Sequence, residues 1–196
     1  DVCSSDLALL LAPGSAEAHV NYAMVLLVAG ELQEAWPHAE FRHALSRGPA
    51  PRSFTQPRWT GSTSLSGQTI LLHGEQGLGD ALQFFRYVAA VRSGAANVIL
   101  EVQPPLRELL AASAGEHTQV LAHGEQLPAF DLHCPLASLP LAFGTVPETI
   151  PARVPYVRVP EKHALRWRGC LGGEPGLKVG VVWADRKSTR LNSSHE

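Results

Sequence analysis

The sequence contains few cysteines, its acidic and basic residues are nearly balanced, and it has no long apolar run. It has three cysteines in 196 residues and no CxxC pair, which excludes a disulfide framework and a cysteine-based zinc site. Its 16 basic and 18 acidic side chains nearly cancel, which argues against a nucleic-acid or membrane-surface partner held by bulk charge. No apolar run approaches about 20 residues, so we predict no membrane span. The sparse cysteines fit a reducing compartment, and we predict a cytoplasmic protein.

The glycine motifs of the common nucleotide-binding enzymes are also missing. Residues 72–87, LHGEQGLGDALQFFRY, space their glycines as G-x-x-G-x-G. The dinucleotide motif is G-x-G-x-x-G, and a nucleoside triphosphate loop needs G-K-[ST], so neither NAD nor ATP is supported. His73, His123 and His133 do not have a metal-ligand spacing. We therefore predict no metal and no resident cofactor.

The amino-acid composition divides the chain into blocks. Residues 8–46 are rich in alanine and leucine with a helical period, broken at Gly30, and a second helix is predicted over residues 32–45. Residues 47–66 are rich in Pro, Gly and Ser and predict an irregular linker. The residues expected to face inward in the helical block are Val20, Ala23, Met24, Leu27, Ala35, Trp36, Ala39 and Leu45.

The block from residue 67 to residue 160 alternates between two patterns. Short apolar runs predict strands at residues 68–73, 97–102 and 118–122, and helical patterns between them span residues 80–93 and 104–113. Strands alternating with helices indicate βαβ units and a parallel sheet. In residues 161–184 we predict a connecting helix over 162–171 and a last buried strand over 177–184.

The two ends of the chain differ from the rest. Residues 1–7, DVCSSDL, and residues 185–190, DRKSTR, resemble the translation of one short-read sequencing adapter read from its two strands. On this interpretation residues 1–7 and 185–196 are adapter-encoded scars that do not belong to the fold. The natural segment is then about residues 8–184, a truncated part of a longer protein.

The helical block resembles a tetratricopeptide repeat. Asn21, Ala23, Gly30 and Ala35 occupy the first-helix, turn and second-helix positions of that family, and the preceding stretch ALLLAPGS resembles the tail of another repeat. Arg42 departs from the pattern where a further repeat should begin. The resemblance therefore implies the last, C-terminal helix pair of an array; an unrelated helical hairpin is the alternative.

The second block resembles bacterial repeat-containing proteins with a glycosyltransferase-like C-terminal region, similar to heptosyltransferases and more distantly to the repeat-bearing O-linked N-acetylglucosamine transferases. The resemblance rests on WTG at 59–61, LLHGEQGLGDALQFFRY, VILEVQPPL, FDLHCPLASLPLAFGT and VGVVWA, in that order. It implies a GT-B fold of two Rossmann-like lobes, of which this chain contains the acceptor-binding N-lobe and the first strand of the C-lobe. The fold class expected is therefore α + α/β, with a helix pair followed by a Rossmann-like parallel-sheet lobe.

The glycine turn supplies the candidate site. Open α/β sheets bind ligands at the carboxyl ends of their strands, where this turn is expected to lie. Asp80 has three interpretations: a general base for an acceptor hydroxyl, which the Gly-Asp pair of heptosyltransferase-like proteins implies; a helix N-cap paired with Gln83; or a binding residue. The residues expected to bind substrate are His73, Glu75, Gln76, Gly77, Gly79 and Gln103.

Three functions remain compatible with the sequence. The first is a GT-B glycosyltransferase that uses a nucleotide sugar, with its repeats presenting a protein or glycan acceptor. The second is an interaction scaffold that carries an inactive transferase-like lobe. The third is another nucleotide-dependent α/β enzyme. On the first interpretation this chain alone is catalytically inert, because the main donor-binding lobe lies outside it.

Overall fold

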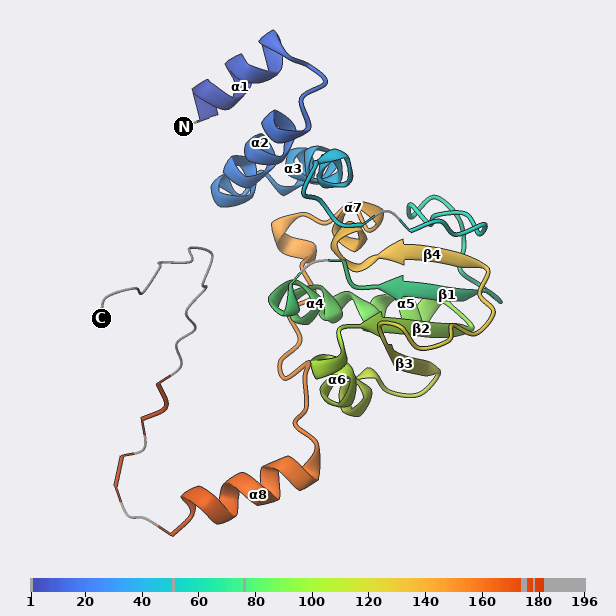
Figure 1. Ribbon diagram of the computed structural model, residues 1–196, viewed down its shortest axis with the longest axis vertical. Helices are drawn as coiled ribbons and strands as arrows, with labels where there is room; N and C mark the ends of the chain where they lie inside the picture. The colour runs from blue at the N-terminus through green and yellow to red at the C-terminus, as the bar shows by residue number, and fades with distance from the viewer. Residues whose placement is uncertain (1, 51, 76, 174–175, 178, 182–196) are drawn as a thin grey trace, which may run out of the picture. The chain divides into compact units, whose positions relative to one another are not determined.

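The computed structural model describes residues 2–50, 52–75, 77–173, 176–177 and 179–181 (Figure 1). The chain divides into two compact units, Asp1–Pro160 and Glu161–Glu196, and each is considered by itself. None of the helices in the described part of the chain combines the length and apolar character that a membrane span requires.

The first unit begins with a block of helices. They are α1 (Val2–Leu11), α2 (Ala16–Ala29), α3 (Leu32–Ala39) and the 3₁₀ helix η1 (Glu40–Ala44). Helix α1 packs beside α2, and α2 packs against α3. Helix α1 includes most of the segment 1–7 that the sequence assigns to an adapter, but the side chains of residues 1–6, like residues 185–196, lie outside the described part.

Local sequence explains where α2 and α3 begin and end. Ser15 caps α2, because its hydroxyl accepts a hydrogen bond from the backbone N–H of Ala18 at 3.2 Å. Gly30 ends α2 in the left-handed conformation, with φ of +86°, so the predicted break at this glycine is present. The predicted second helix, residues 32–45, is in fact α3 followed by η1. Pro37 lies inside α3 and has no N–H, which weakens the α-helical ladder just before the change to 3₁₀ geometry.

The buried face of the helix pair differs in part from the predicted one. Ala23 and Ala35 are buried as expected, and Leu26 is buried as well. Met24 was predicted to face inward, but 60 % of it is exposed. The inward stripe of α2 includes Ala16, Ala23 and Leu26, which are spaced by seven and three residues; Met24 lies to one side of this stripe.

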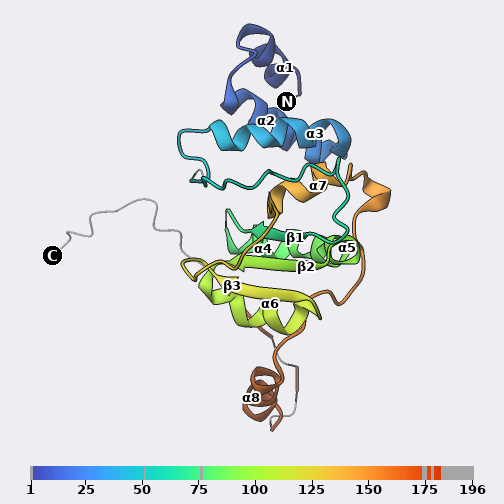
Figure 2. The same ribbon diagram turned by 90° about the vertical axis from the view of Figure 1, so that its right-hand side faces the viewer.

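A four-stranded parallel sheet forms the centre of the unit. Its strands are β1 (Thr69–His73), β2 (Asn97–Val102), β3 (Thr118–Ala122) and β4 (Leu132–Pro135), in the order β3-β2-β1-β4 (Figures 1 and 2). The three strands predicted between residues 67 and 160 are confirmed. Strand β4 was missed, because its four residues, LHCP, are too short and too polar to give an apolar run. All pairs are parallel, so the carboxyl ends of the strands meet at one edge.

Helices cover one face of the sheet. They are α4 (Leu78–Phe84), η2 (Phe85–Tyr87), α5 (Val88–Gly94), η3 (Pro104–Leu106) and α6 (Arg107–Ala114), followed after β4 by η4 (Leu136–Ser138), α7 (Leu139–Ala142) and η5 (Pro147–Thr149). Apolar side chains from all of these helices except η5, which buries no residue, pack in one cluster with Ile70, Leu72, Leu100 and Cys134 from the strands. The helix predicted over residues 80–93 begins earlier, at Leu78, and includes the 3₁₀ turn η2.

The opposite face is covered by irregular chain. Leu71, Ile99 and Leu121 point to this face and pack against Phe54 from the linker and Phe130 from the β3–β4 connection. Side chains alternate between the two faces of a strand. His73 follows Leu71 by two residues and Glu101 follows Ile99 by two, so polar side chains continue this face toward the carboxyl edge.

The helical block contacts the lobe through Trp36. The indole N–H of Trp36, on α3, donates to the backbone carbonyl of Thr145 at 2.8 Å. The hydroxyl of Tyr87 donates to Oγ1 of the same threonine at 3.1 Å. Trp59, in the linker, is buried in the core cluster and donates to the carbonyl of Thr63. Trp36 therefore joins the helical block to the lobe, and Trp59 anchors the linker in the core of the lobe.

The second unit contains α8 (Glu161–Leu171), in agreement with the helix predicted over residues 162–171. The strand predicted over residues 177–184 is not present in the described residues Leu177, Val179, Gly180 and Val181, whose three apolar side chains are largely exposed. A buried strand requires a hydrogen-bonded neighbour, and the described residues of this unit contain no other strand. Lys178 and residues 182–184 lie outside the described part.

Candidate functional site

A cavity of about 670 Å³ lies at the carboxyl edge of the sheet. It is lined from the strands and the turns after them by His73, Gly74, Glu75, Glu101, His123, Gly124, His133 and Pro135, and from the N-terminal side by His43, Pro49, Ala50, Arg52 and Arg58. The chain places β2 and β3 on one side of β1 and then returns to place β4 on the other. The carboxyl ends of β1 and β4 thus form the topological switch point, where open α/β sheets bind ligands.

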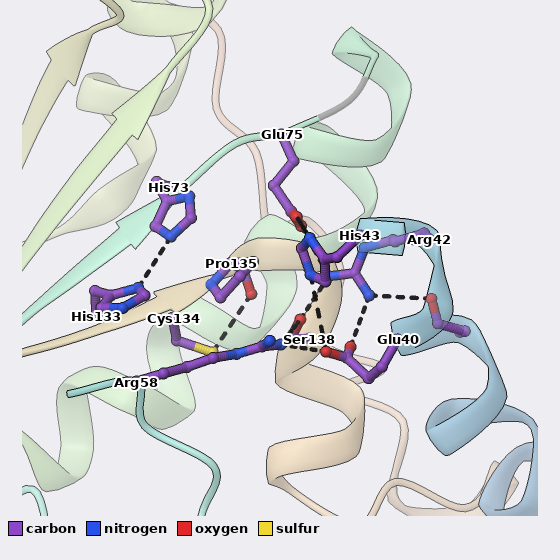
Figure 3. Close-up of polar contacts among 11 residues, drawn as sticks. Glu40, Arg42, His43, Arg58, His73, Glu75, His133, Cys134, Pro135 and Ser138 are labelled. Atoms are coloured by element: carbon purple, nitrogen blue, oxygen red, sulfur yellow. Dashed lines mark hydrogen bonds and ion pairs between the residues drawn. The ribbon is translucent and has the colours of Figure 1, made fainter. Parts of the chain in front are cut away.

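Two imidazoles face each other across β1 and β4. Nε2 of His73 lies 3.3 Å from Nδ1 of His133 (Figure 3). His73 is 4 % exposed. Its burial, with the nearby charge of Arg52, lowers the pKa of His73 from 6.5 to about 3. Burial also lowers the pKa of His133. Both rings are therefore neutral at pH 7 and can exchange hydrogen bonds with hydroxyl groups.

A carboxylate and a guanidinium occupy the neighbouring part of the cavity. Glu101, inside the apolar strand β2, is 3 % exposed and accepts a hydrogen bond from Nη1 of Arg52. The Arg52 guanidinium also stacks over the Phe54 ring, with 4.8 Å between the Cζ atom and the ring centroid. The linker thus supplies the cation that permits a charge inside the central strand, because an unpaired buried carboxylate is costly.

Arg42 is the centre of a second polar network, which joins the helical block to the lobe (Figure 3). Its Nη1 donates to Oε1 of Glu40 at 2.6 Å, and its Nη2 donates to Oε2 of Glu75 at 2.9 Å. The same Nη2 lies 2.5 Å from the Ser138 hydroxyl. Arg58 also donates to Glu40 and to Ser138. The network therefore links η1, the turn after β1, the linker and η4.

Burial and pairing oppose each other in this network. Burial raises the pKa of Glu75 more than the Arg42 guanidinium lowers it. For Glu40 burial acts in the same direction, but Arg42 and Arg58 outweigh it and the pKa of Glu40 is lowered. Burial opposes the charge of Arg42, yet Glu75 and Glu40 hold its pKa above the usual value. His43, 3.3 Å from Glu75 Oε1, has its pKa lowered to about 4, first by burial and then by Arg42.

The structure brings some of the predicted site residues to the cavity and leaves others away from it. His73 and Glu75 line it. The side chain of Gln103 packs beside Gly74 at the cavity edge, since a Cβ on that glycine would lie 3.5 Å from Gln103 Oε1. Gly77 and Gly79 are exposed and do not line the cavity. Gln76 lies outside the described residues.

Asp80 is placed as a helix-capping side chain, though not at the predicted N-cap position. Gly77 is the N-cap of α4, with extended dihedrals, and Asp80 is the third residue of the helix. Its Oδ2 accepts a hydrogen bond from the backbone N–H of Gly77 at 2.9 Å. The glycine has no side chain, so only this half of a capping box exists. Asp80 does not line the cavity, and its catalytic role remains a prediction.

Several residues of the site were not predicted, although the sequence carries a signal for some of them. Glu101 is an acidic residue inside the otherwise apolar run NVILEV, which indicates a buried charge with a partner. Arg42 follows the buried Ala35 by seven residues, and this spacing places it on the same helical face. His133, Arg52, Arg58 and Ser138 carry no such signal, because the β4 and linker positions depend on tertiary contacts.

The cavity is suited to a ligand with several hydroxyl groups. It offers guanidinium donors, neutral imidazoles and carboxylate acceptors within one concave space, and such polar groups orient a ligand in a pocket. Cys134 is no nucleophile here, since burial raises the pKa of its thiol to about 12. Among the described residues, no three His, Cys, Asp or Glu side chains converge as metal ligands.

The buried imidazole of His73 predicts a pH dependence of stability. Its folded pKa, about 3, is below the ordinary value of 6.5, so between these values the unfolded chain binds a proton that the folded chain does not. The corresponding stability is complete above about pH 6.5 and is lost as the pH falls toward 3. We expect His73→Leu to flatten the dependence of the unfolding free energy on pH in this window, as measured by urea denaturation. His123→Asn, which removes an exposed imidazole, is the control; equal slopes for His73→Leu and wild type would contradict the prediction.

The chain is similar to Protein FlbA of Caulobacter vibrioides, with 28 % identity over 210 aligned residues that cover 95 % of this chain. The chain spans 34 % of the length of that curated relative. No family model matches the sequence, and no solved structure matches it.

Proposed function

We propose that this chain is part of a repeat-containing, glycosyltransferase-like protein, and that the cavity at the carboxyl edge of the sheet receives the acceptor. The complete protein would transfer a sugar from a nucleotide sugar to a protein or glycan acceptor. The observation that supports this best is the cavity of about 670 Å³ at the β1–β4 switch point, lined by groups that hydrogen-bond hydroxyls. The helix pair packed against the lobe is suited to presenting a protein acceptor.

The proposal assigns separate roles to the two parts of the complete protein. Donor binding belongs to a second lobe, and acceptor binding belongs to the cavity of this chain. Isothermal titration of the complete protein against UDP-, GDP- and ADP-sugars is expected to show saturable binding of one nucleotide class. His133→Asn is expected to leave that affinity unchanged but to lower kcat/KM for the acceptor, because His133 lines the acceptor cavity. The 196-residue chain alone is expected to transfer no sugar.

A second candidate function is an interaction scaffold with an inactive lobe. It is favoured by the engagement of the cavity carboxylates: Glu75 is paired with Arg42 and Glu101 with Arg52, so both already have protein partners. Titration separates the two functions. If no nucleotide sugar binds to the complete protein, the scaffold is supported, and sugar transfer by the 196-residue chain alone would contradict the GT-B proposal itself.

A further inference from the structure

A second cavity, of about 240 Å³, lies on the helix-covered side of the sheet. Its walls come from η2, α5, the end of α6 and the segment 151–158, all within the first unit. Four of its lining residues are arginines and none is acidic. They are Arg86, Arg92, Arg153 and Arg158.

These four guanidiniums are not neutralised by acidic side chains among the residues that the structure describes. In the described part of the chain, none of them takes part in an ion pair. The protein as a whole has a net charge of −2, so this concentration of positive charge is local. Like charges that line one concavity raise its potential and attract an anion.

Two of the arginines are held in position by the protein. Nη1 of Arg86 donates to the carbonyl of Pro151 at 2.7 Å, and the Arg86 guanidinium lies over the Tyr156 ring, 4.3 Å from its centroid. Nη1 of Arg92 donates to the carbonyl of Ala114 at 2.5 Å. These contacts use one nitrogen of each guanidinium, which has five N–H donors in all. The remaining donors are available for a ligand.

The chain at the end of α6 is shaped around Arg92. Gly115 follows this helix with φ of +78°, and a Cβ at that position would lie 1.8 Å from Nη1 of Arg92. A side chain there would displace the guanidinium. The hydrogen bond to the Ala114 carbonyl holds Arg92 at the wall of the cavity.

We propose that this arginine-lined cavity binds a small, soluble, phosphate-bearing molecule. Guanidinium groups bind phosphate oxygens in pairs of parallel hydrogen bonds, and several together match a group that carries more than one negative charge. The volume is below the range of about 300–1,000 Å³ typical of sites for drug-sized ligands, which favours a phosphate or diphosphate group over a whole nucleotide sugar. The inference is independent of the proposed transfer activity, because the two cavities share no lining residue and the acceptor cavity lies at the carboxyl edge of the sheet.

Inorganic pyrophosphate is the probe for this site. Isothermal titration of the full 196-residue chain, in a phosphate-free buffer, is expected to give one saturable site with a Kd of about 1 mM or tighter. Among the described residues, the side chains of Arg153 and Arg158 form no hydrogen bond or ion pair. The double variant Arg153→Gln/Arg158→Gln should therefore fold as wild type does. We expect this double variant to bind pyrophosphate at least about tenfold more weakly.

A matched variant tests whether the effect is specific to the cavity. Arg47→Gln/Arg166→Gln also removes two positive charges, but from exposed positions outside the cavity. This variant should bind pyrophosphate as wild type does. The proposal would be overturned if both double variants bound pyrophosphate equally weakly. It would also be overturned if Arg52→Gln lost pyrophosphate binding while Arg153→Gln/Arg158→Gln bound it as wild type does. Binding to phosphatidylglycerol vesicles without binding to pyrophosphate, or no saturable binding by the wild-type chain, would overturn it as well.

Discussion

Replacing Arg42 with methionine is expected to lower the free energy of unfolding of the 196-residue chain by about 3–5 kcal/mol. Methionine keeps most of the aliphatic volume but removes the charge and every N–H donor. The Glu75 side chain, 5 % exposed, then loses its paired cation, and Arg58, the other cation of the network, already contacts Glu40 and Ser138. A buried carboxylate without a partner is costly. Urea denaturation at pH 7 measures the change.

Two further variants show whether the loss of stability comes from the unpaired Glu75 carboxylate. Arg42→Met/Glu75→Leu removes both partners and is expected to recover more than half of the lost stability, since apolar replacement of a buried pair is often neutral or stabilising. Arg107→Met breaks the exposed pair with Glu125, whose nitrogen and oxygen atoms are 3.0 Å apart, and is expected to cost about 0–1 kcal/mol. If Arg42→Met costs no more than Arg107→Met, water already solvates the network and the prediction is wrong.

The sequence predicts the parallel sheet well because its signals are local. The runs TILLH and NVILEV are short, apolar and followed by helical patterns, and both faces of such strands are buried in a parallel sheet. The break at Gly30 is likewise local, because glycine accepts the left-handed conformation at a helix end. The strand β4 lacks this pattern and exists through pairing with β1.

The candidate site was only partly predictable for the same reason. His73 is the last residue of β1 and Glu75 lies two residues after it, so the rule for ligands at carboxyl edges finds both. Arg42 and Arg58 reach the site from segments that are distant in sequence from β1, and only the packing of the helical block on the lobe brings them there. A side chain such as Arg42 can be suspected from its helical spacing, but its partner cannot be named before the fold is known.

Asp80→Asn is expected to lower sugar transfer by the complete protein by about 100-fold or more, if Asp80 is the general base of the proposed reaction. The capping contact is preserved, because the amide oxygen of asparagine can accept the hydrogen bond that Oδ2 now accepts from Gly77. Only the interaction of the carboxylate charge with the helix dipole is lost, worth about 0.3–1 kcal/mol. Turnover should therefore fall far more than stability, and measuring kcat beside urea denaturation of the same variant checks this.

Glu75→Gln is the comparison that locates the base, because Glu75 lines the cavity and Asp80 does not. Its carboxylate is buried and its pKa is raised by that burial, which is the direction of shift expected for a carboxylate that accepts a proton in catalysis. If Asp80→Asn keeps full activity while Glu75→Gln loses it, the base is in the cavity and Asp80 acts only as a helix cap. If Asp80→Asn loses activity with little change in stability, α4 must bring its first turn to the acceptor when the second lobe is present.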